Sequence, residues 1–189
     1  QTLARIRPGS RVLILGSGIS GLLHVQLART LGAARVISTD INKYRLKMAQ
    51  QFGAEAVIHA KEDVPARLRE VNEGRLADCV IICTGALPAM VQALQSIDCG
   101  GTIVFFAPTE TGVDVPLPIT ELWRREITLM TSYGASPADL VIALELIRAR
   151  NVRAREMITH RLTLTEIGLG FKLVADAKES LKVIIEPFR

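Results

Sequence analysis

Short apolar runs alternate with amphipathic stretches between residues 11 and 106 of the chain. Runs rich in β-branched residues predict buried strands, and apolar residues recurring every three or four positions predict helices. The predicted strands cover residues 11–15, 35–40, 56–58, 78–83 and 102–106. The predicted helices between them cover residues 18–31, 42–52, 64–71 and 88–95. This alternation predicts an α/β protein in which helices cover both faces of a doubly wound parallel sheet.

Beyond residue 107 the pattern is less regular. The prolines within residues 113–118 predict an extended segment at a sheet edge, because proline cannot donate to a central ladder. Residues 127–133 predict a sixth strand. Ser136 and Pro137 then predict the start of a long helix, since serine is a favoured N-cap and proline a favoured first helical residue.

The C-terminal residues predict a strand, a helix and a strand. These three elements are expected over residues 157–164, 165–177 and 181–185. The sheet predicted before them is already complete, so this apolar tail is expected to pack on a part of the protein outside this chain. The sequence therefore predicts one α/β domain over residues 1–152 and a separate C-terminal segment over residues 153–189.

The first strand runs into a Gly-x-Gly-x-x-Gly motif that opens the first helix. Gly16 permits the tight turn, Gly18 lets a pyrophosphate approach the backbone, and Gly21 lets the helix pack closely on the strand. Unpaired N–H groups and the helix dipole favour an anion at this helix N-terminus. In its strand–turn–helix context the motif predicts a Rossmann fold that binds a dinucleotide. A purely structural turn, or a nucleotide site of another class, is the alternative.

Asp40 ends the second apolar run, about twenty residues after the motif. A carboxylate at this point accepts hydrogen bonds from the adenosine ribose and repels a 2′-phosphate, which predicts NAD rather than NADP. Lys43 and Arg45 are nearby cations, but they do not remove the acid. The alternative is that Asp40 caps the helix that begins near Asn42.

Composition and charge narrow the class of protein. The 189 residues are 49% hydrophobic, which fits a buried parallel sheet, and no apolar run is long enough to span a membrane. The net charge of +4 is modest, and the basic residues 148–155 are expected to be a solvated helix end rather than a nucleic-acid patch. The chain begins at Gln1 without a charged-then-apolar leader, so the expectation is a cytoplasmic protein.

The cysteines and histidines predict neither a disulfide framework nor a metal site. Cys79 and Cys83 lie on one predicted strand about 13 Å apart, too far for a disulfide or for two thiolates on one zinc. Cys99 is expected alone in a turn. The three histidines lack metal-ligand spacing and are expected to be structural or exposed; they are His24, His59 and His160.

Several of these segments together resemble the zinc-dependent medium-chain dehydrogenases, namely the alcohol, sorbitol and threonine dehydrogenases. The resemblance rests on residues 16–21, 36–43, 83–85 and 100–104, and on the tail 158–162. It extends over essentially the whole chain. In that family a GroES-like catalytic domain, with its zinc ligands, largely precedes the coenzyme domain. The resemblance therefore implies that this chain is a coenzyme-binding domain with the returning C-terminal remnant, and that it is inactive alone.

The resemblance also implies what the parent enzyme does. It oxidises a secondary alcohol or polyol, with zinc polarising the alkoxide and NAD accepting the hydride. The implied cofactor-binding residues are Gly16, Ser17, Gly18, Ile19 and Ser20 at the pyrophosphate, Asp40, Ile41 and Arg45 at the adenosine ribose, and Cys83, Thr84, Phe106 and Ser132 at the nicotinamide. No catalytic residue or metal ligand is carried over to this chain. Many relatives have glycine where Phe106 stands, which puts close backbone approach in doubt. The family further implies a homodimer or tetramer joined through strands such as residues 127–133.

Other functions compete with this interpretation. A non-catalytic NAD-sensing module also fits, although it does not explain the C-terminal segment. A zinc-free reductase of the same superfamily fits as well. A short-chain dehydrogenase needs Tyr-x-x-x-Lys, but Met48 follows Tyr44 and Pro137 follows Tyr133 at that spacing. A methyltransferase does not explain the Thr-Gly turn at residues 84–85 or the tail.

Overall fold

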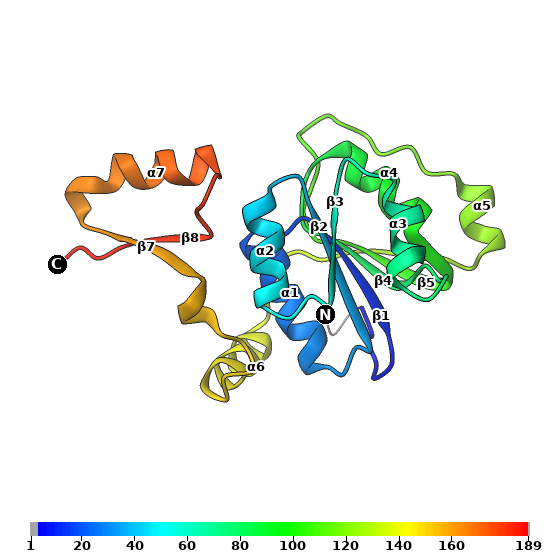
Figure 1. Cartoon of the computed structure of the whole chain (residues 1–189), viewed down its shortest axis with the longest axis horizontal. Coiled ribbons are helices and arrows are strands. Elements are labelled where there is room, and N and C mark those ends of the chain that lie inside the picture. The colour runs from blue at the N-terminus through cyan, green and yellow to red at the C-terminus, as the bar shows by residue number, and fades with distance from the viewer. Residues whose placement is uncertain (1–3, 189) are drawn as a thin grey trace.

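The computed structural model describes residues 4–188, so residues 1–3 and 189 of the two predicted domains lie outside the described residues. Within the described part of the chain, six strands form one sheet in the order β3-β2-β1-β4-β5-β6, and every neighbouring pair is parallel. The strands are β1 (Arg11–Leu15), β2 (Arg35–Asp40), β3 (Ala56–His59), β4 (Ala77–Ile82), β5 (Ile97–Phe105) and β6 (Thr128–Thr131). The predicted doubly wound parallel sheet is confirmed (Figure 1).

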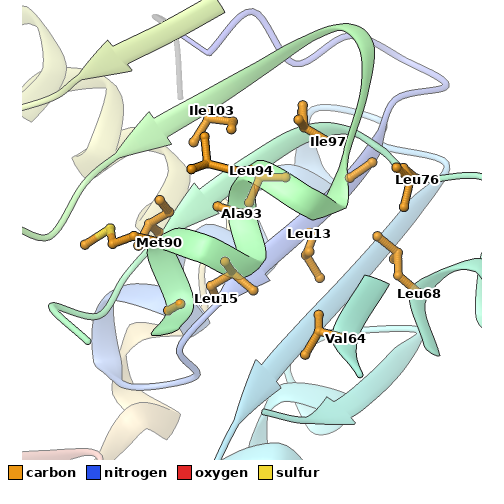
Figure 2. Packing of buried hydrophobic residues seen from close by; sticks show 14 of the residues in the cluster. Leu13, Leu15, Val64, Leu68, Leu76, Met90, Ala93, Leu94, Ile97 and Ile103 are labelled. Carbon is orange, nitrogen blue, oxygen red and sulfur yellow. The ribbon is translucent and has the colours of Figure 1, made fainter. Parts of the chain in front are cut away.

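Helices cover both faces of this sheet. They are α1 (Ile19–Thr30), α2 (Lys43–Gln51), α3 (Val64–Val71) and α4 (Leu87–Ser96). Successive residues of β1 point to opposite faces, so Leu13 and Leu15 pack with α3 and α4, whereas Val12 and Ile14 pack with α1 and α2. Figure 2 shows Met90 and the following turn of α4 over Leu13 and Leu15. Burial of each such large side chain contributes about 1.5–3 kcal/mol.

The connection between β5 and β6 differs from the prediction. Residues 113–118 form no strand but a loop that leads into α5 (Ile119–Arg124). Pro116 and Pro118 would leave two missing donors on the same side of a strand, so this segment does not extend the sheet. The edge strand on this side of the sheet is β6, which pairs with β5 and is shorter than predicted.

The C-terminal third of the described chain leaves the six-stranded sheet. Ser136 caps α6 (Pro137–Arg148) as predicted and forms a capping box with Asp139, but no residue of α6 is buried. A second, two-stranded parallel sheet follows. Its elements are the 3₁₀ turns η1 (Ala154–Met157) and η2 (Leu164–Glu166), with β7 (Ile158–Leu162), α7 (Ile167–Asp176) and β8 (Lys182–Ile185). The predicted strand–helix–strand segment is therefore present, and Figure 1 shows it beside α2.

Among the basic residues 148–155, Arg148, Arg150 and Arg155 are exposed as predicted, whereas Arg153 is partly buried. The Arg153 guanidinium lies 4.9 Å from the centre of the Phe52 ring and donates to the backbone oxygen of Gln51 at 2.6 Å. The prediction of a solvated helix end is wrong for Arg153, which ties the C-terminal segment to α2. Among the described helices, none combines the length and the apolar character that a membrane span needs.

Candidate functional site

The turn after β1 brings the strand and the first helix into close contact. Gly16 has a φ of +96°, a conformation that glycine adopts without strain. A β-carbon on Gly16 would lie 3.2 Å from the backbone oxygen of Cys83, and one on Gly21 would lie 1.8 Å from the backbone oxygen of Gly16. The tight turn predicted at Gly16 and the close packing predicted at Gly21 are confirmed.

Gly18 leaves the N-terminus of α1 open. It is the N-cap residue of α1, and no side chain among the described residues caps this helix. A β-carbon on Gly18 would meet a single atom within about 4 Å, Nη1 of Arg45 at 4.0 Å. The backbone N–H groups of the first turn, the helix dipole and a neighbouring guanidinium therefore face the same open space. This arrangement fits a diphosphate.

Asp40 ends β2 beside this turn, with 7% of its surface exposed. Its Oδ2 accepts the backbone N–H of Ser17 at 2.8 Å, and its Oδ1 accepts the backbone N–H of Asn42 at 2.8 Å. Nη1 of Arg45 lies 4.0 Å from Oδ2. Each carboxylate oxygen has two acceptor positions, so each retains one for a ribose hydroxyl.

Asn42, not Asp40, is the N-cap of α2. Its side-chain oxygen accepts the backbone N–H groups of Tyr44 at 2.8 Å and Arg45 at 3.3 Å. The alternative that Asp40 caps this helix is therefore wrong. The carboxylate faces the glycine turn instead.

Ser17 fixes the turn onto β2. Its side chain is fully buried, its Oγ lies 2.9 Å from Oγ of Ser38, and it donates to the backbone oxygen of Thr39 at 3.0 Å. The backbone N–H of Gly16 also donates to the oxygen of Thr39 at 2.9 Å. The turn that holds Gly18 is thus positioned by hydrogen bonds from both its backbone and its side chain.

A cleft of about 380 Å³ lies beside this turn, outside the carboxyl ends of the strands. The crevice includes the point between β1 and β4 where the strand order reverses, which is where such sheets bind ligands. The predicted site residues that line it are Gly16, Gly18, Asp40, Ile41, Arg45, Cys83 and Thr84. The charged side chains that line the cleft are the carboxylate of Asp40 and the cations of Arg45 and Lys61.

Five predicted site residues lie outside the lining of this cleft. They are Ser17, Ile19, Ser20, Phe106 and Ser132. Phe106 follows β5, and its ring meets that of His24 edge to face, with centroids 4.6 Å apart. Burial lowers the pKa of His24 to about 4, so this imidazole is neutral at pH 7. Ser132 follows β6, and its backbone N–H donates to the backbone oxygen of Phe105 at 3.2 Å.

The cysteines are free thiols. Burial raises the pKa of Cys79 and of Cys83 to about 12, so neither is a thiolate at neutral pH. Cys99 is exposed, as a turn would leave it, but it lies within β5. Across residues 4–188, no three His, Cys, Asp or Glu side chains lie together in a way that could hold a metal ion.

Sequence reasoning missed Lys61 and Gln92 as lining residues. Lys61 follows the carboxyl end of β3, so the rule that places ligands beside strand ends could have found it. Gln92 lies on α4 and donates from Nε2 to the backbone oxygen of Ala60 at 2.8 Å. No local signal distinguishes Gln92, because its position depends on how α4 is rotated against the sheet.

Comparison with known proteins identifies the family. The model of the family described as zinc-binding dehydrogenase matches residues 20–149. "Probable D-xylulose reductase A" of Aspergillus clavatus is 31% identical over 191 residues, which cover 98% of this chain and 52% of that protein. The chain belongs to the zinc-binding dehydrogenase family.

Another curated relative and two solved structures agree with this assignment. A sorbitol dehydrogenase of Halalkalibacterium halodurans is 29% identical over 187 residues, which cover 96% of this chain and 53% of that protein. An NADP-bound structure from Sinorhizobium meliloti 1021, assigned to the zinc-binding dehydrogenases, is 29% identical with a TM-score of 0.88 and matches 98% of this chain and 55% of its own. The alcohol dehydrogenase TADH from Thermus sp. ATN1 is 25% identical with a TM-score of 0.90, matching 98% of this chain and 53% of its own.

The resemblance to the zinc-dependent medium-chain dehydrogenases is therefore confirmed. This chain spans about half the length of the curated relatives that it matches.

Proposed function

We propose that this chain is the NAD-binding part of a zinc-dependent dehydrogenase that oxidises a secondary alcohol or a polyol. One observation carries the proposal: a single cleft joins the open backbone at Gly18, the uncapped N-terminus of α1 and the carboxylate of Asp40. The family assignment, and polyol-acting enzymes such as sorbitol dehydrogenase among the relatives, support the substrate class.

The pyrophosphate is proposed to lie over the glycine turn. Gly16 and Gly18 provide the close backbone approach, and the N–H groups of Ile19 and Ser20 point along the axis of α1 towards the anion. Ser17 acts by holding the turn against β2. All five residues are thereby assigned to the phosphate end of the site.

The adenosine ribose is proposed to bind at Asp40, with Arg45 beside the carboxylate and the exposed side chain of Ile41 against the sugar. The nicotinamide end is proposed to face Cys83 and Thr84, with Phe106 and Ser132 farther along the same sheet edge. When bound, NAD supplies the ring that accepts hydride. The residues of this chain bind and orient it, and none of them is assigned a proton transfer to substrate.

The preference for NAD over NADP rests on the charge of Asp40. A 2′-phosphate on the ribose would stand beside a carboxylate that is almost fully buried, where repulsion is stronger than in bulk water. Arg45 and Lys61 oppose this repulsion, and one solved relative binds NADP. The proposed preference is therefore one of degree, and it needs a direct measurement.

Calorimetric titration of the chain with NAD and with NADP tests the site. We expect the wild type to bind NAD more tightly than NADP, and Asp40→Ala to lose most of this difference. Asp40→Asn keeps the size of the side chain and removes only its charge, so it is expected to lose this difference as well. Equal affinity of the wild type for both cofactors would contradict the NAD preference, and binding of neither would overturn the dinucleotide site.

The proposal extends to the whole protein. Zinc and its ligands are assigned to the part of the parent enzyme that this chain does not include, so the chain alone is expected to have no turnover. Measurable alcohol oxidation by the isolated chain would contradict that assignment.

A homodimer through the β6 edge, testable by sedimentation of the longer protein, is also proposed. A cytoplasmic location is proposed because three free thiols suit a reducing compartment.

A further inference from the structure

Asn42 connects the cofactor cleft to the C-terminal segment. Its backbone N–H donates to the carboxylate of Asp40 at 2.8 Å, and its side-chain oxygen caps α2, which carries Arg45. Its amide nitrogen reaches the C-terminal segment, where it donates to the backbone oxygens of Ala177 at 2.9 Å and Lys178 at 2.8 Å. One residue thus contacts both the proposed ribose-binding group and a turn 135 residues away in the sequence.

The turn that Asn42 contacts is itself held in place. Ala177 ends α7 in the left-handed conformation, with a φ of +49°. The buried side chain of Ser180 donates to the backbone oxygen of Leu173 at 2.7 Å, and the backbone N–H of Leu181 donates to Oγ1 of Thr159 at 3.1 Å. These bonds join the turn to α7 and to β7, so the position of residues 177–178 is coupled to that of both elements. Figure 1 shows this end of α7 facing α2.

The side-chain chemistry of Asn42 matches this double role. An asparagine amide has two acceptor positions and two N–H donors, and all four are used here. Aspartate or serine would also cap the helix, but neither can donate two hydrogen bonds to the C-terminal turn. The cap alone therefore does not account for the amide.

We propose that Asn42 is a positioning residue through which NAD binding and the seating of the C-terminal segment strengthen each other. The inference rests on the proposed function. Contacts from the ribose to Asp40 and Arg45 hold residues 40–45 in one conformation, which presents the Asn42 amide to Ala177 and Lys178. By linkage, docking of the C-terminal segment raises the affinity for NAD by the same factor by which bound NAD stabilises the docked segment.

Asn42→Ser tests the coupling, because serine keeps the N-cap and loses the reach to the C-terminal turn. Asn72→Ser is the matched control. The Asn72 amide also donates to two backbone oxygens, those of Arg75 and Leu76 at 3.0 Å each, but it lies before β4 at the opposite end of the sheet from the cleft. Ser180→Ala is a second variant, which loosens the turn without touching the cleft.

Two measurements are made on the full chain: NAD affinity by calorimetry, and amide hydrogen exchange of residues 176–182 with and without NAD. We expect NAD to slow this exchange in the wild type and in Asn72→Ser. We expect Asn42→Ser to abolish the slowing and to weaken NAD binding at least about five-fold. Ser180→Ala is expected to weaken binding in the same direction. If NAD binds the wild type, but Asn42→Ser and Ser180→Ala show the wild-type NAD affinity and the wild-type slowing of exchange, the coupling alone is overturned. If the wild type binds no NAD, the proposed function is overturned together with the coupling.

Discussion

The backbone oxygen of Gly16 lies 1.8 Å from the position that a β-carbon on Gly21 would take. Real β-carbons do not approach a backbone atom closer than about 3.0 Å, so any side chain at this position forces α1 away from β1. Leu22 and Val25 of the same helix are fully buried against the sheet. Gly21 therefore sets the distance at which the helix and the strand pack.

Gly21→Ala is expected to lower the free energy of unfolding by about 3 kcal/mol, the upper end of what overpacking a core costs. The methyl group would collide with the turn that carries Gly16, and α1 would have to shift. Chemical denaturation of the wild type and the variant measures the difference. A loss below about 1 kcal/mol would show that the turn adjusts more easily than this contact indicates.

Gly18→Ala is expected to separate binding from stability. Gly18 has a φ of −68°, which any residue adopts, and its surroundings leave room for a methyl group. We expect the free energy of unfolding to stay within about 0.5 kcal/mol of the wild type. NAD affinity should fall about ten-fold or more, equivalent to about 1.4 kcal/mol, because the methyl group occupies the space proposed for the pyrophosphate. Wild-type affinity in a calorimetric titration would place the phosphates elsewhere.

The glycine turn could be predicted from the sequence because its constraints are local. A positive φ at Gly16 and a missing β-carbon at Gly21 leave a direct mark on residue type. The helix that follows Ser136 was equally predictable, since its cap and its first proline are adjacent in the chain. What these elements pack against is a different matter, and α6 turned out to have no buried residue.

Contacts between distant segments could not be predicted in this way. Asn42 was expected only to lie near the start of a helix, yet its amide also reaches Ala177 and Lys178. Gln92 and Lys61 join the cleft through the placement of α4 and of the β3 loop. Residue type alone is compatible with many partners for an amide or an ammonium group, and the tertiary arrangement selects one.

His24 is expected to make stability fall as the pH is lowered from about 6.5 towards 4. Burial lowers the pKa of the folded-state imidazole to about 4 from an ordinary value of 6.5. Between these values the unfolded chain binds a proton that the folded chain does not, so acid favours unfolding; below about pH 4 both states are protonated and this contribution stops growing.

Comparison of the wild type with His24→Gln isolates this contribution from that of the carboxylates. Between pH 7.5 and pH 5 the free energy of unfolding should fall by about 2 kcal/mol more in the wild type than in the variant. Urea denaturation at several pH values supplies the measurement. Parallel pH profiles for the two proteins would mean that His24 can take up a proton in the folded state.

Gln26, on α1, connects this helix to the C-terminal segment. Its Oε1 accepts the backbone N–H of Arg153 at 2.7 Å, and its Nε2 lies 3.4 Å from the sulfur of Met157. Gln26 and Met157 are both buried, so the amide satisfies a backbone donor where water has little access. The stacking of Arg153 on Phe52 holds the same segment by an independent contact.

Gln26→Leu is therefore expected to loosen residues 152–157 without unfolding the chain. Leucine keeps most of the buried volume but leaves the N–H of Arg153 without its acceptor, which costs about 1–3 kcal/mol. Amide exchange over residues 152–157 should accelerate, and the free energy of unfolding should fall by that amount. Gln50→Leu is the matched control, since it makes the same exchange of side chain at an exposed position of α2 and should stay within about 0.5 kcal/mol of the wild type. Unchanged exchange in Gln26→Leu would assign the hold on this segment to Arg153, Phe52 and the buried Met157 instead.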